Sequence, residues 1–261
     1  MAVREIWGDE TSDVTSGDAR LWRYFKPERF LETLDKRSLY FSSAREFEDP
    51  FEGACEVQPH GVPVEEVLER RKHRMPRGLL DYGTVSRAFS AMEQLRRLTK
   101  ISCWHLAEYE SDAMWQLYAG KGKGIAVTTT VDRLRAALKP FRLDPAYGEE
   151  EPYAGKVRYV DLSTTRLTVG MERTFFYKHR AFEWEREYRI AISVRMAEEF
   201  GVTVPEKGIL VDFDPRVLID EVWIGKNTSE AQQLQIRDRC GQAGLENRLR
   251  MSTLLGRPWY F

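Results

Sequence analysis

The sequence has little of what metal and thiol sites are usually built from. Its four histidines show no HxxxH or HExxH spacing, so a mononuclear zinc enzyme is not expected. Its three cysteines lie far apart and form no CxxC pair, which is typical of a reducing compartment. Cys103 and His105 would share one face of a short strand, where a buried thiol is favoured over a nucleophile.

Long apolar runs and an excess of one charge are also missing. No apolar run approaches the roughly 20 residues that span a bilayer, and the first residues, MAVREIWGDE, contain no signal-peptide core. Lys and Arg total 40 against 41 for Asp and Glu, so no overall field recruits nucleic acid or a membrane. We therefore expect a cytoplasmic protein without a membrane partner.

What is present is the composition of a globular protein. The 261 residues are 42% hydrophobic and 31% charged, and we expect a single domain over residues 1–261. An aromatic content of 12% favours a sheet-rich core or an aromatic pocket. Residues 64–100 are rich in Arg and Lys and predict a helical insertion with one basic face. A helix face exposed to solvent explains these charges more simply than a bound polyanion does.

The segment 182–192, FEWEREYRIAI, alternates apolar and polar residues with a period of two. This pattern predicts a half-buried strand that carries Glu183, Glu185, Glu187 and Arg189 on one face. In a cleft, such a row of carboxylates can serve as a tunable acid or base. A solvated outer face, with arginine balancing the acids, is the alternative, and the pattern alone favours neither.

Shorter apolar runs and capping residues predict the rest of the fold. Pro27 suits the first position of a helix, and Ser111 and Thr130 can each cap the start of another helix. Residues 1–19 are expected to be a weakly ordered lead-in, and a helix is expected to reach about residue 178. The glycine turn KGKG at 121–124 lacks the Ser/Thr of a P-loop and is a weak phosphate signal. Further strands are expected at 21–25, 38–43, 101–105, from 125, at 156–160, 208–213 and 219–224. The predicted fold class is α+β, with a mainly antiparallel sheet and flanking helices.

Four stretches of the chain, in this order, resemble a widespread bacterial family of unknown function. They are YFSSAREFEDPFEG, AMWQLYAGKGKGIAV, FYKHRAFEWEREYR and LIDEVWIGKN, and the resemblance covers residues 21–225. The family supplies no activity, so the chemistry has to be argued from the residues.

Three short motifs within these stretches are also similar to the split sheet of ADP-ribosyltransferases. That resemblance implies NAD as the substrate, no metal, and catalysis by Glu185 and Glu187 on the late strand. The oxocarbenium ion that forms when nicotinamide leaves ribose would be stabilised by such a carboxylate. The NAD-binding residues that the resemblance implies are Arg23, Tyr24, Tyr40, Ser42, Ser43 and Trp184.

Two other functions remain open at this stage. A nuclease could hold Mg²⁺ with Asp49, Glu52, Glu185 and Glu187, with Lys178 supporting the nucleophile. A non-enzymatic sensor or partner-binding module would use the same residues structurally. If the protein uses NAD, the sequence does not identify the acceptor of ADP-ribose, which could be protein, nucleic acid, a small molecule or water. A bacterial phage-defence or toxin role follows only by analogy.

Overall fold

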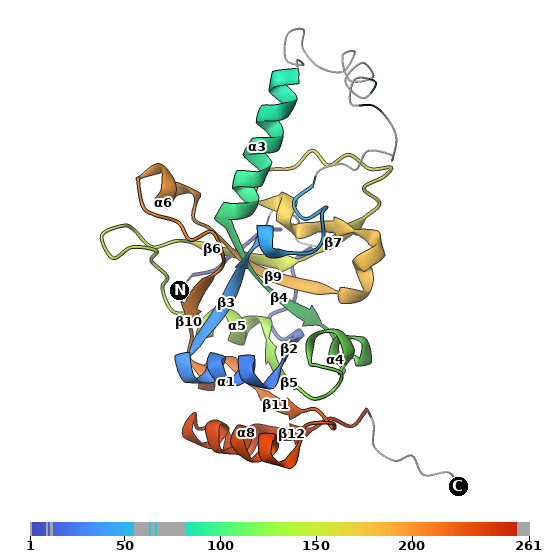
Figure 1. The fold of residues 1–261 in the computed structure, drawn as a ribbon, viewed down its shortest axis with the longest axis vertical. Helices are drawn as coiled ribbons and strands as arrows, with labels where there is room; N and C mark the ends of the chain where they lie inside the picture. The colour runs from blue at the N-terminus through green and yellow to red at the C-terminus, as the bar shows by residue number, and fades with distance from the viewer. Residues whose placement is uncertain are drawn as a thin grey trace.

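The structure is a computed structural model that describes residues 2–54 except 9, 11 and 12, residues 63 and 66, and residues 82–254. It has a mixed α+β fold with a large, mostly antiparallel sheet and several helices (Figure 1). Cys55 and, within the predicted insertion at 64–100, residues 64, 65 and 67–81 lie outside the described residues.

The large sheet follows the order β1-β6-β9-β4-β2-β5-β11-β12, and β3 pairs with both β4 and β10. Its strands are β1 (Arg4–Glu5), β2 (Arg20–Phe25), β3 (Ser38–Ser43), β4 (Thr99–Leu106), β5 (Ile125–Thr130), β6 (Pro152–Lys156), β9 (Glu187–Ser193), β10 (Ile209–Asp212), β11 (Glu221–Ile224) and β12 (Leu249–Met251). A separate parallel pair consists of β7 (Arg158–Val160) and β8 (Tyr177–His179).

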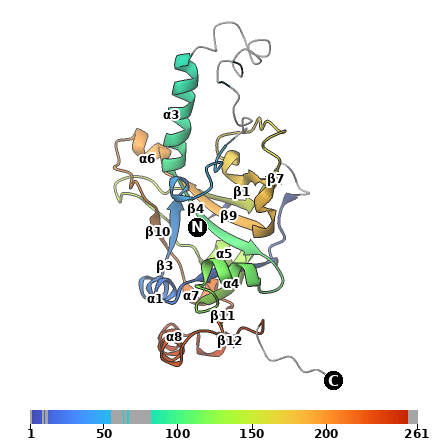
Figure 2. The same ribbon diagram turned by 45° about the vertical axis from the view of Figure 1, so that its right-hand side comes forward.

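Helices connect and cover these strands. The α-helices are α1 (Pro27–Lys36), α3 (Tyr82–Leu98), α4 (Asp112–Tyr118), α5 (Val131–Ala137), α6 (Arg195–Glu199), α7 (Pro215–Leu218) and α8 (Glu230–Gln242). The 3-10 turns are η2 (Ala44–Glu46), η3 (Arg173–Phe176), η4 (Arg180–Glu185) and η5 (Glu246–Arg248). Figures 1 and 2 show α3 projecting from the body, while α1 and α8 lie side by side at the opposite end.

The sheet forks at β4. The first part of β4 pairs with β3, where Ser42 is opposite Ile101, and the last part pairs with β2, where Trp22 is opposite His105. Arg23 bridges the fork, because its guanidinium donates to Ser102 Oγ at 2.6 Å and to a backbone carbonyl of β3 at 3.0 Å. The two neighbours of β4 therefore diverge and leave part of its edge uncovered.

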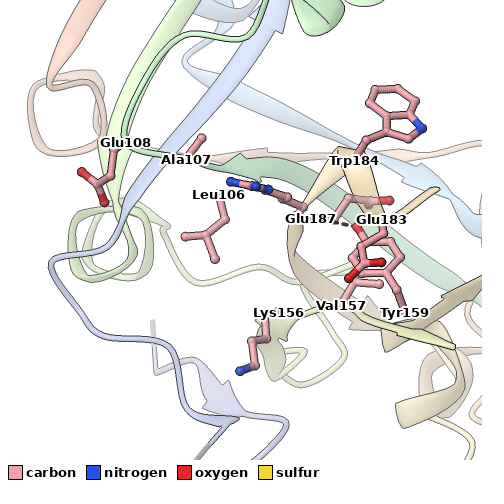
Figure 3. A pocket seen from close by; sticks show the side chains of 10 residues that line it. Leu106, Ala107, Glu108, Lys156, Val157, Tyr159, Glu183, Trp184 and Glu187 are labelled. Atoms are coloured by element: carbon pink, nitrogen blue, oxygen red, sulfur yellow. Dashed lines mark hydrogen bonds between the residues drawn. The ribbon is translucent and has the colours of Figure 1, made fainter. Parts of the chain in front are cut away.

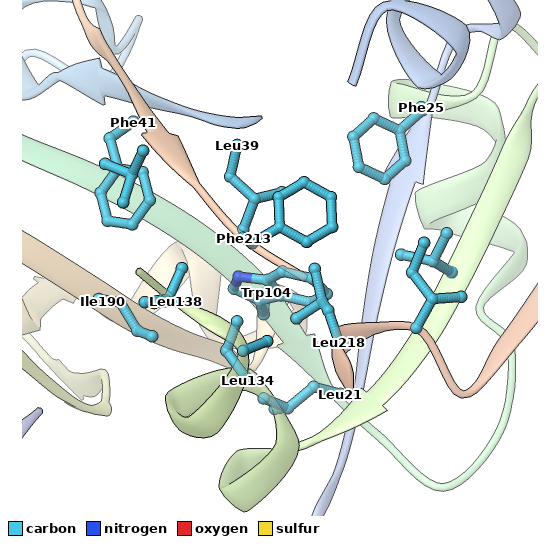
Figure 4. Packing of buried hydrophobic residues seen from close by; sticks show 14 of the residues in the cluster. Leu21, Phe25, Leu39, Phe41, Trp104, Leu134, Leu138, Ile190, Phe213 and Leu218 are labelled. Atoms are coloured by element: carbon cyan, nitrogen blue, oxygen red, sulfur yellow. The ribbon is translucent and has the colours of Figure 1, made fainter. Parts of the chain in front are cut away.

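The main core lies on one face of the sheet, under α1, α5, α7 and α8 (Figure 4). On β9 it takes alternate residues, among them Tyr188 and Ile190, as the period-two pattern predicts. The opposite face has two smaller aromatic clusters, one around Trp7 and one around Trp22 and Trp115. Glu187 and Arg189 face that side, so the charged residues of β9 lie between the aromatic clusters.

Local chemistry explains where the helices begin. Pro27 occupies the first turn of α1, where its missing N–H costs nothing. The side chains of Ser111 and Thr130 accept hydrogen bonds from the first turns of α4 and α5. These starts, and the predicted strands at 21–25 and 38–43, are confirmed.

The predicted strand at 182–192 is wrong in its first half. Residues 180–185 form η4, Arg186 adopts a left-handed conformation with φ 42°, and the strand begins at Glu187. The partner strand β4 ends at Leu106, opposite the residue before Glu187, so the earlier residues have no ladder to join. Glu183, Glu185 and Glu187 therefore do not form one row.

Two other expectations are corrected. Residues 1–19 are not a loose lead-in, because β1 pairs with β6 and the fully buried Trp7 donates its indole N–H to the Lys156 carbonyl at 2.9 Å. The helix expected up to residue 178 is replaced by η3 and β8, with Phe175 and Phe176 buried. Within the described residues, no helix has the length and apolarity needed to cross a bilayer.

Gly124, between α4 and β5, is predicted to tolerate no side chain. A Cβ atom there would lie 2.1 Å from the Phe25 carbonyl oxygen and 2.8 Å from that of Ala119. Because both are backbone atoms, Gly124→Ala should lower the free energy of unfolding by about 1–3 kcal/mol in a urea titration. At Gly148 a Cβ would meet nothing within 4 Å, and an equal loss for Gly148→Ala would contradict this explanation.

Candidate active site

Five charged side chains of alternating sign form a continuous chain of ion pairs on the sheet face opposite the main core. In order they are Glu185, Lys178, Glu187, Arg189 and Glu52. All five side chains are buried. Three are acidic and two are basic, so the fully ionised chain carries one excess negative charge.

Four elements supply these groups, with Lys178 on β8 and Glu185 at the end of η4. Glu187 and Arg189 are two residues apart on β9 and therefore share a face. Glu52 comes from the turn after η2, where the Asp49 side chain accepts a backbone N–H and Gly53 takes a φ of 76°. The segment DPFEG therefore forms a turn, and this turn positions the Glu52 carboxylate in the site.

Arg189 is the centre of the chain. Its guanidinium binds Glu52 through two oxygens, at 2.5 and 3.0 Å, and Nε donates to Glu187 at 2.8 Å. It also donates to the Phe175 carbonyl at 2.6 Å. Lys178 Nζ then lies between Glu187, at 2.9 Å, and Glu185. Each charge in the interior is thereby matched by an opposite one, as burial requires.

The two glutamates at the open end have different pKa values. Burial, reinforced by the neighbouring Glu187, raises the pKa of Glu185 to about 7. Burial alone would also raise the pKa of Glu187, but Arg189 and Lys178 outweigh it and hold that pKa well below its usual range. At neutral pH Glu187 is a fixed anion, whereas Glu185 exchanges a proton readily.

Two further side chains contact Glu185. The Tyr118 hydroxyl, on α4, donates to Glu185 Oε1 at 3.2 Å. His105 Nδ1 lies 2.6 Å from the Glu185 carbonyl oxygen, which can only accept, so Nδ1 carries the proton and Nε2 keeps a lone pair. Burial lowers the pKa of His105, which favours the neutral ring at pH 7.

A cavity of about 300 Å³ opens against this charged wall. Its walls, which come from both sides of the sheet fork, contain carboxylates, guanidinium groups, hydroxyl groups and aromatic rings. Five residues that the sequence predicted as site residues line it: Arg23, Tyr24, Ser42, Glu185 and Glu187. The remaining lining residues are Trp22, Phe47, Ile101, Cys103, Trp104, His105, Met114, Tyr118, Lys178 and Arg189.

The other three predicted site residues lie elsewhere. The Tyr40 hydroxyl bonds to Glu46 and to the Gly208 N–H, away from the cavity. Ser43 is buried and caps η2. Trp184 lines a different hollow and is 43% exposed. None of these three side chains lines the cavity. Tyr40 shares a face of β3 with Ser42, but its hydroxyl is held by Glu46 and Gly208. Ser43 points to the opposite face of β3, and residue 184 lies in η4 rather than in a strand.

That second hollow, of about 700 Å³, is shown in Figure 3. Its lining includes Lys156, Tyr159, Trp184 and Glu187. Glu187 therefore borders both hollows, and its backbone N–H donates to the Tyr159 hydroxyl at 2.8 Å.

The geometry of the site bears on two alternatives raised by the sequence, a Mg²⁺-dependent nuclease and a nucleophilic Cys103. Within the described ranges, no group of three or more His, Cys, Asp or Glu side chains is arranged to hold a metal ion. Glu52 and Glu187 already bind Arg189, so their oxygens are occupied by a cation. Burial and the neighbouring Glu187 raise the pKa of the Cys103 thiol well above its usual value, which opposes a thiolate nucleophile.

Among the groups of this site, the sequence did not single out Tyr118, and it named Glu52 only as a ligand of a possible Mg²⁺ site. Glu187 and Arg189 could be recognised from a local pattern, because they are two residues apart on a predicted strand. The contacts that Glu52 and Tyr118 make with Arg189 and Glu185 join segments more than 60 residues apart, and no local pattern announces them.

Removal of Arg189 should strongly destabilise the protein. Arg189→Met leaves the buried Glu52 and Glu187 without their guanidinium, which should cost about 3–5 kcal/mol in urea unfolding. Arg189→Met combined with Glu52→Gln should recover part of the loss. Arg195→Met is the matched control, because the exposed Arg195–Glu199 pair should contribute less than about 1 kcal/mol. A loss of that small size at Arg189 would contradict the central role of its ion pairs.

Glu185 should make stability fall as the pH rises. Its pKa is raised to about 7 in the folded protein, so the folded state binds more protons than the unfolded state between the ordinary glutamate pKa and about 7. Glu185→Gln should therefore gain stability relative to the natural protein when melting is measured at pH 8 instead of pH 5. A relative gain in the opposite direction would show that the pKa of Glu185 is lowered.

Comparisons of the chain with protein-family models, with curated proteins and with solved structures found no match. The resemblances drawn from short motifs therefore stay predictions, and the function has to be argued from the geometry of the site.

Proposed function

We propose that the cavity binds NAD and that the protein is an ADP-ribosyltransferase-like enzyme that uses NAD as its substrate. The observation that carries this proposal is the excess negative charge of the ion-pair chain, which ends at Glu185 on the cavity wall. The nicotinamide ring of NAD is cationic, and its departure transfers positive charge to the ribose. A buried carboxylate stabilises that charge most where it develops, in the transition state.

The two glutamates would divide the work. Glu187, held ionised by Arg189 and Lys178, supplies a fixed negative charge beside the ribose. Glu185, with a pKa of about 7, accepts a proton. Two carboxylates whose surroundings separate their pKa values are the usual basis for distinct acid–base roles.

The proposed reaction balances without a further reagent. The bond between ribose C1′ and the nicotinamide nitrogen breaks, and its electron pair leaves with neutral nicotinamide. An oxygen or nitrogen of the acceptor, or of water, then bonds to C1′, and its proton passes to Glu185. General base catalysis of this kind contributes roughly 10²–10⁴-fold to a rate.

The other walls of the cavity fit the rest of the ligand. Arg23 has no carboxylate partner among the described residues, and burial lowers its pKa to about 10, so it can receive an anionic group such as a phosphate. Trp22 and Tyr24 stack at 6.2 Å and offer an aromatic surface. The volume of about 300 Å³ suits the nicotinamide half of NAD, with the remainder lying outside.

No observation favours the nuclease over this proposal. A non-enzymatic module would retain the same ion pairs, and only a turnover assay separates it from an enzyme. A role as an NAD-consuming effector in bacterial defence accords with the proposal by analogy alone.

The test is release of nicotinamide from NAD, followed by chromatography. Glu185→Gln should lower kcat by about 10²–10⁴-fold, because the base is lost. Arg23→Gln should mainly raise KM, because one anion contact is lost. Both variants should be checked for a cooperative melting transition.

Tyr40→Phe is the matched control, since the Tyr40 hydroxyl bonds outside the cavity, and its turnover should be unchanged. If the natural protein releases no nicotinamide and its melting temperature does not rise with NAD or ADP-ribose, the proposal is wrong and a binding module remains.

A further inference from the structure

Two glycine turns interlock at the edge of the sheet near the end of α4. One is the turn 120–124, in which Gly120, Lys121 and Gly122 have φ angles of 61°, 60° and 75°. The other follows β11, and its backbone N–H groups at 225 and 227 donate to carbonyls of 124 and 122 at 2.9 and 3.0 Å. The Asn227 side chain also donates to the Lys121 carbonyl at 3.0 Å. The two turns are therefore fixed against one another.

This arrangement brings lysines together. The β5–β11 pairing, continued by the two hydrogen bonds, places Lys226 opposite Lys123, while Lys121 lies on the same turn. All three lysines are exposed. Like charges directly opposite one another destabilise a strand pair, and none of the salt bridges among the described residues involves these lysines. An anionic ligand would remove this cost.

The basic turns lie beside the candidate active site. Lys121 is three residues from Tyr118, so their Cα atoms are at most about 11 Å apart. Tyr118 is 46% exposed, and its hydroxyl bonds to Glu185. Leu117, next to it, is 59% exposed. An exposed leucine and an exposed tyrosine thus precede the lysines of the turn 120–124 along the chain, and the tyrosine lines the cavity.

We propose that this surface, formed by Lys121, Lys123, Lys226, Leu117 and Tyr118, binds single-stranded nucleic acid. The lysines would receive successive phosphates, and Tyr118 would stack on a base, which is the combination that sequence-tolerant single-strand binding uses. A strand held there would present a nucleotide near Glu185. That it is the acceptor of ADP-ribose rests on the proposed function, whereas the binding itself does not.

The experiment is fluorescence anisotropy with a labelled oligonucleotide of about 12 nucleotides, within the usual site sizes, titrated at several salt concentrations without NAD. The natural protein should bind, with an affinity that falls as salt rises. The variant Lys121→Gln/Lys123→Gln/Lys226→Gln should bind more weakly, and the slope of log K against log salt should decrease by about two. Tyr118→Leu should weaken binding with the slope unchanged.

The matched control changes the same number of exposed lysines elsewhere, Lys26→Gln/Lys139→Gln/Lys207→Gln. Equal weakening by both triple variants, or no binding by the natural protein, overturns the proposal. Binding to phosphatidylserine vesicles but not to the oligonucleotide also overturns it, in favour of a membrane surface. If the oligonucleotide binds as expected while no nicotinamide is released from NAD, the proposed function fails and this surface stands.

Discussion

The burial of one guanidinium organises the charged half of this protein. Arg189 is 1% exposed, and a charge so placed costs several kcal/mol unless it is paired and hydrogen-bonded. Its partners are Glu52 and Glu187, together with the Phe175 carbonyl. Each partner belongs to a different segment, namely the turn after η2, β9 and η3. The site therefore forms only when these segments have come together, which ties its geometry to completion of the fold.

The fork of the sheet is the second constraint. If β2 and β3 ran side by side along β4, their edges would close over the residues that now line the cavity. Instead β4 pairs with each over only part of its length, and Arg23 spans the gap through Ser102 and a carbonyl of β3. The cavity is thus a consequence of strand divergence, and Arg23, which stabilises the divergence, also lines the cavity.

Much of this fold follows from local patterns. The period-two alternation on β9, the proline at the start of α1 and the capping hydroxyls of Ser111 and Thr130 all act within a few residues, and each prediction is confirmed. The prediction at 182–186 was wrong because alternation alone does not provide a pairing partner. The burial of Trp7 depends on contacts some 150 residues away, which no local pattern reveals.

The uneven number of charges explains why chemistry is expected at one end of the chain and not at the other. The Glu52 end is closed, since both its oxygens bind Arg189 and its surroundings exclude water. At the other end, the Glu185 carboxylate contacts Lys178 and the Tyr118 hydroxyl, and it borders the cavity. The excess negative charge at Glu185 can be neutralised by a proton, by a cationic ring or by a developing positive charge. Only one of these can neutralise it at a time. Under the proposed function, binding of the cationic ring would therefore be coupled to proton release at Glu185, as linkage requires.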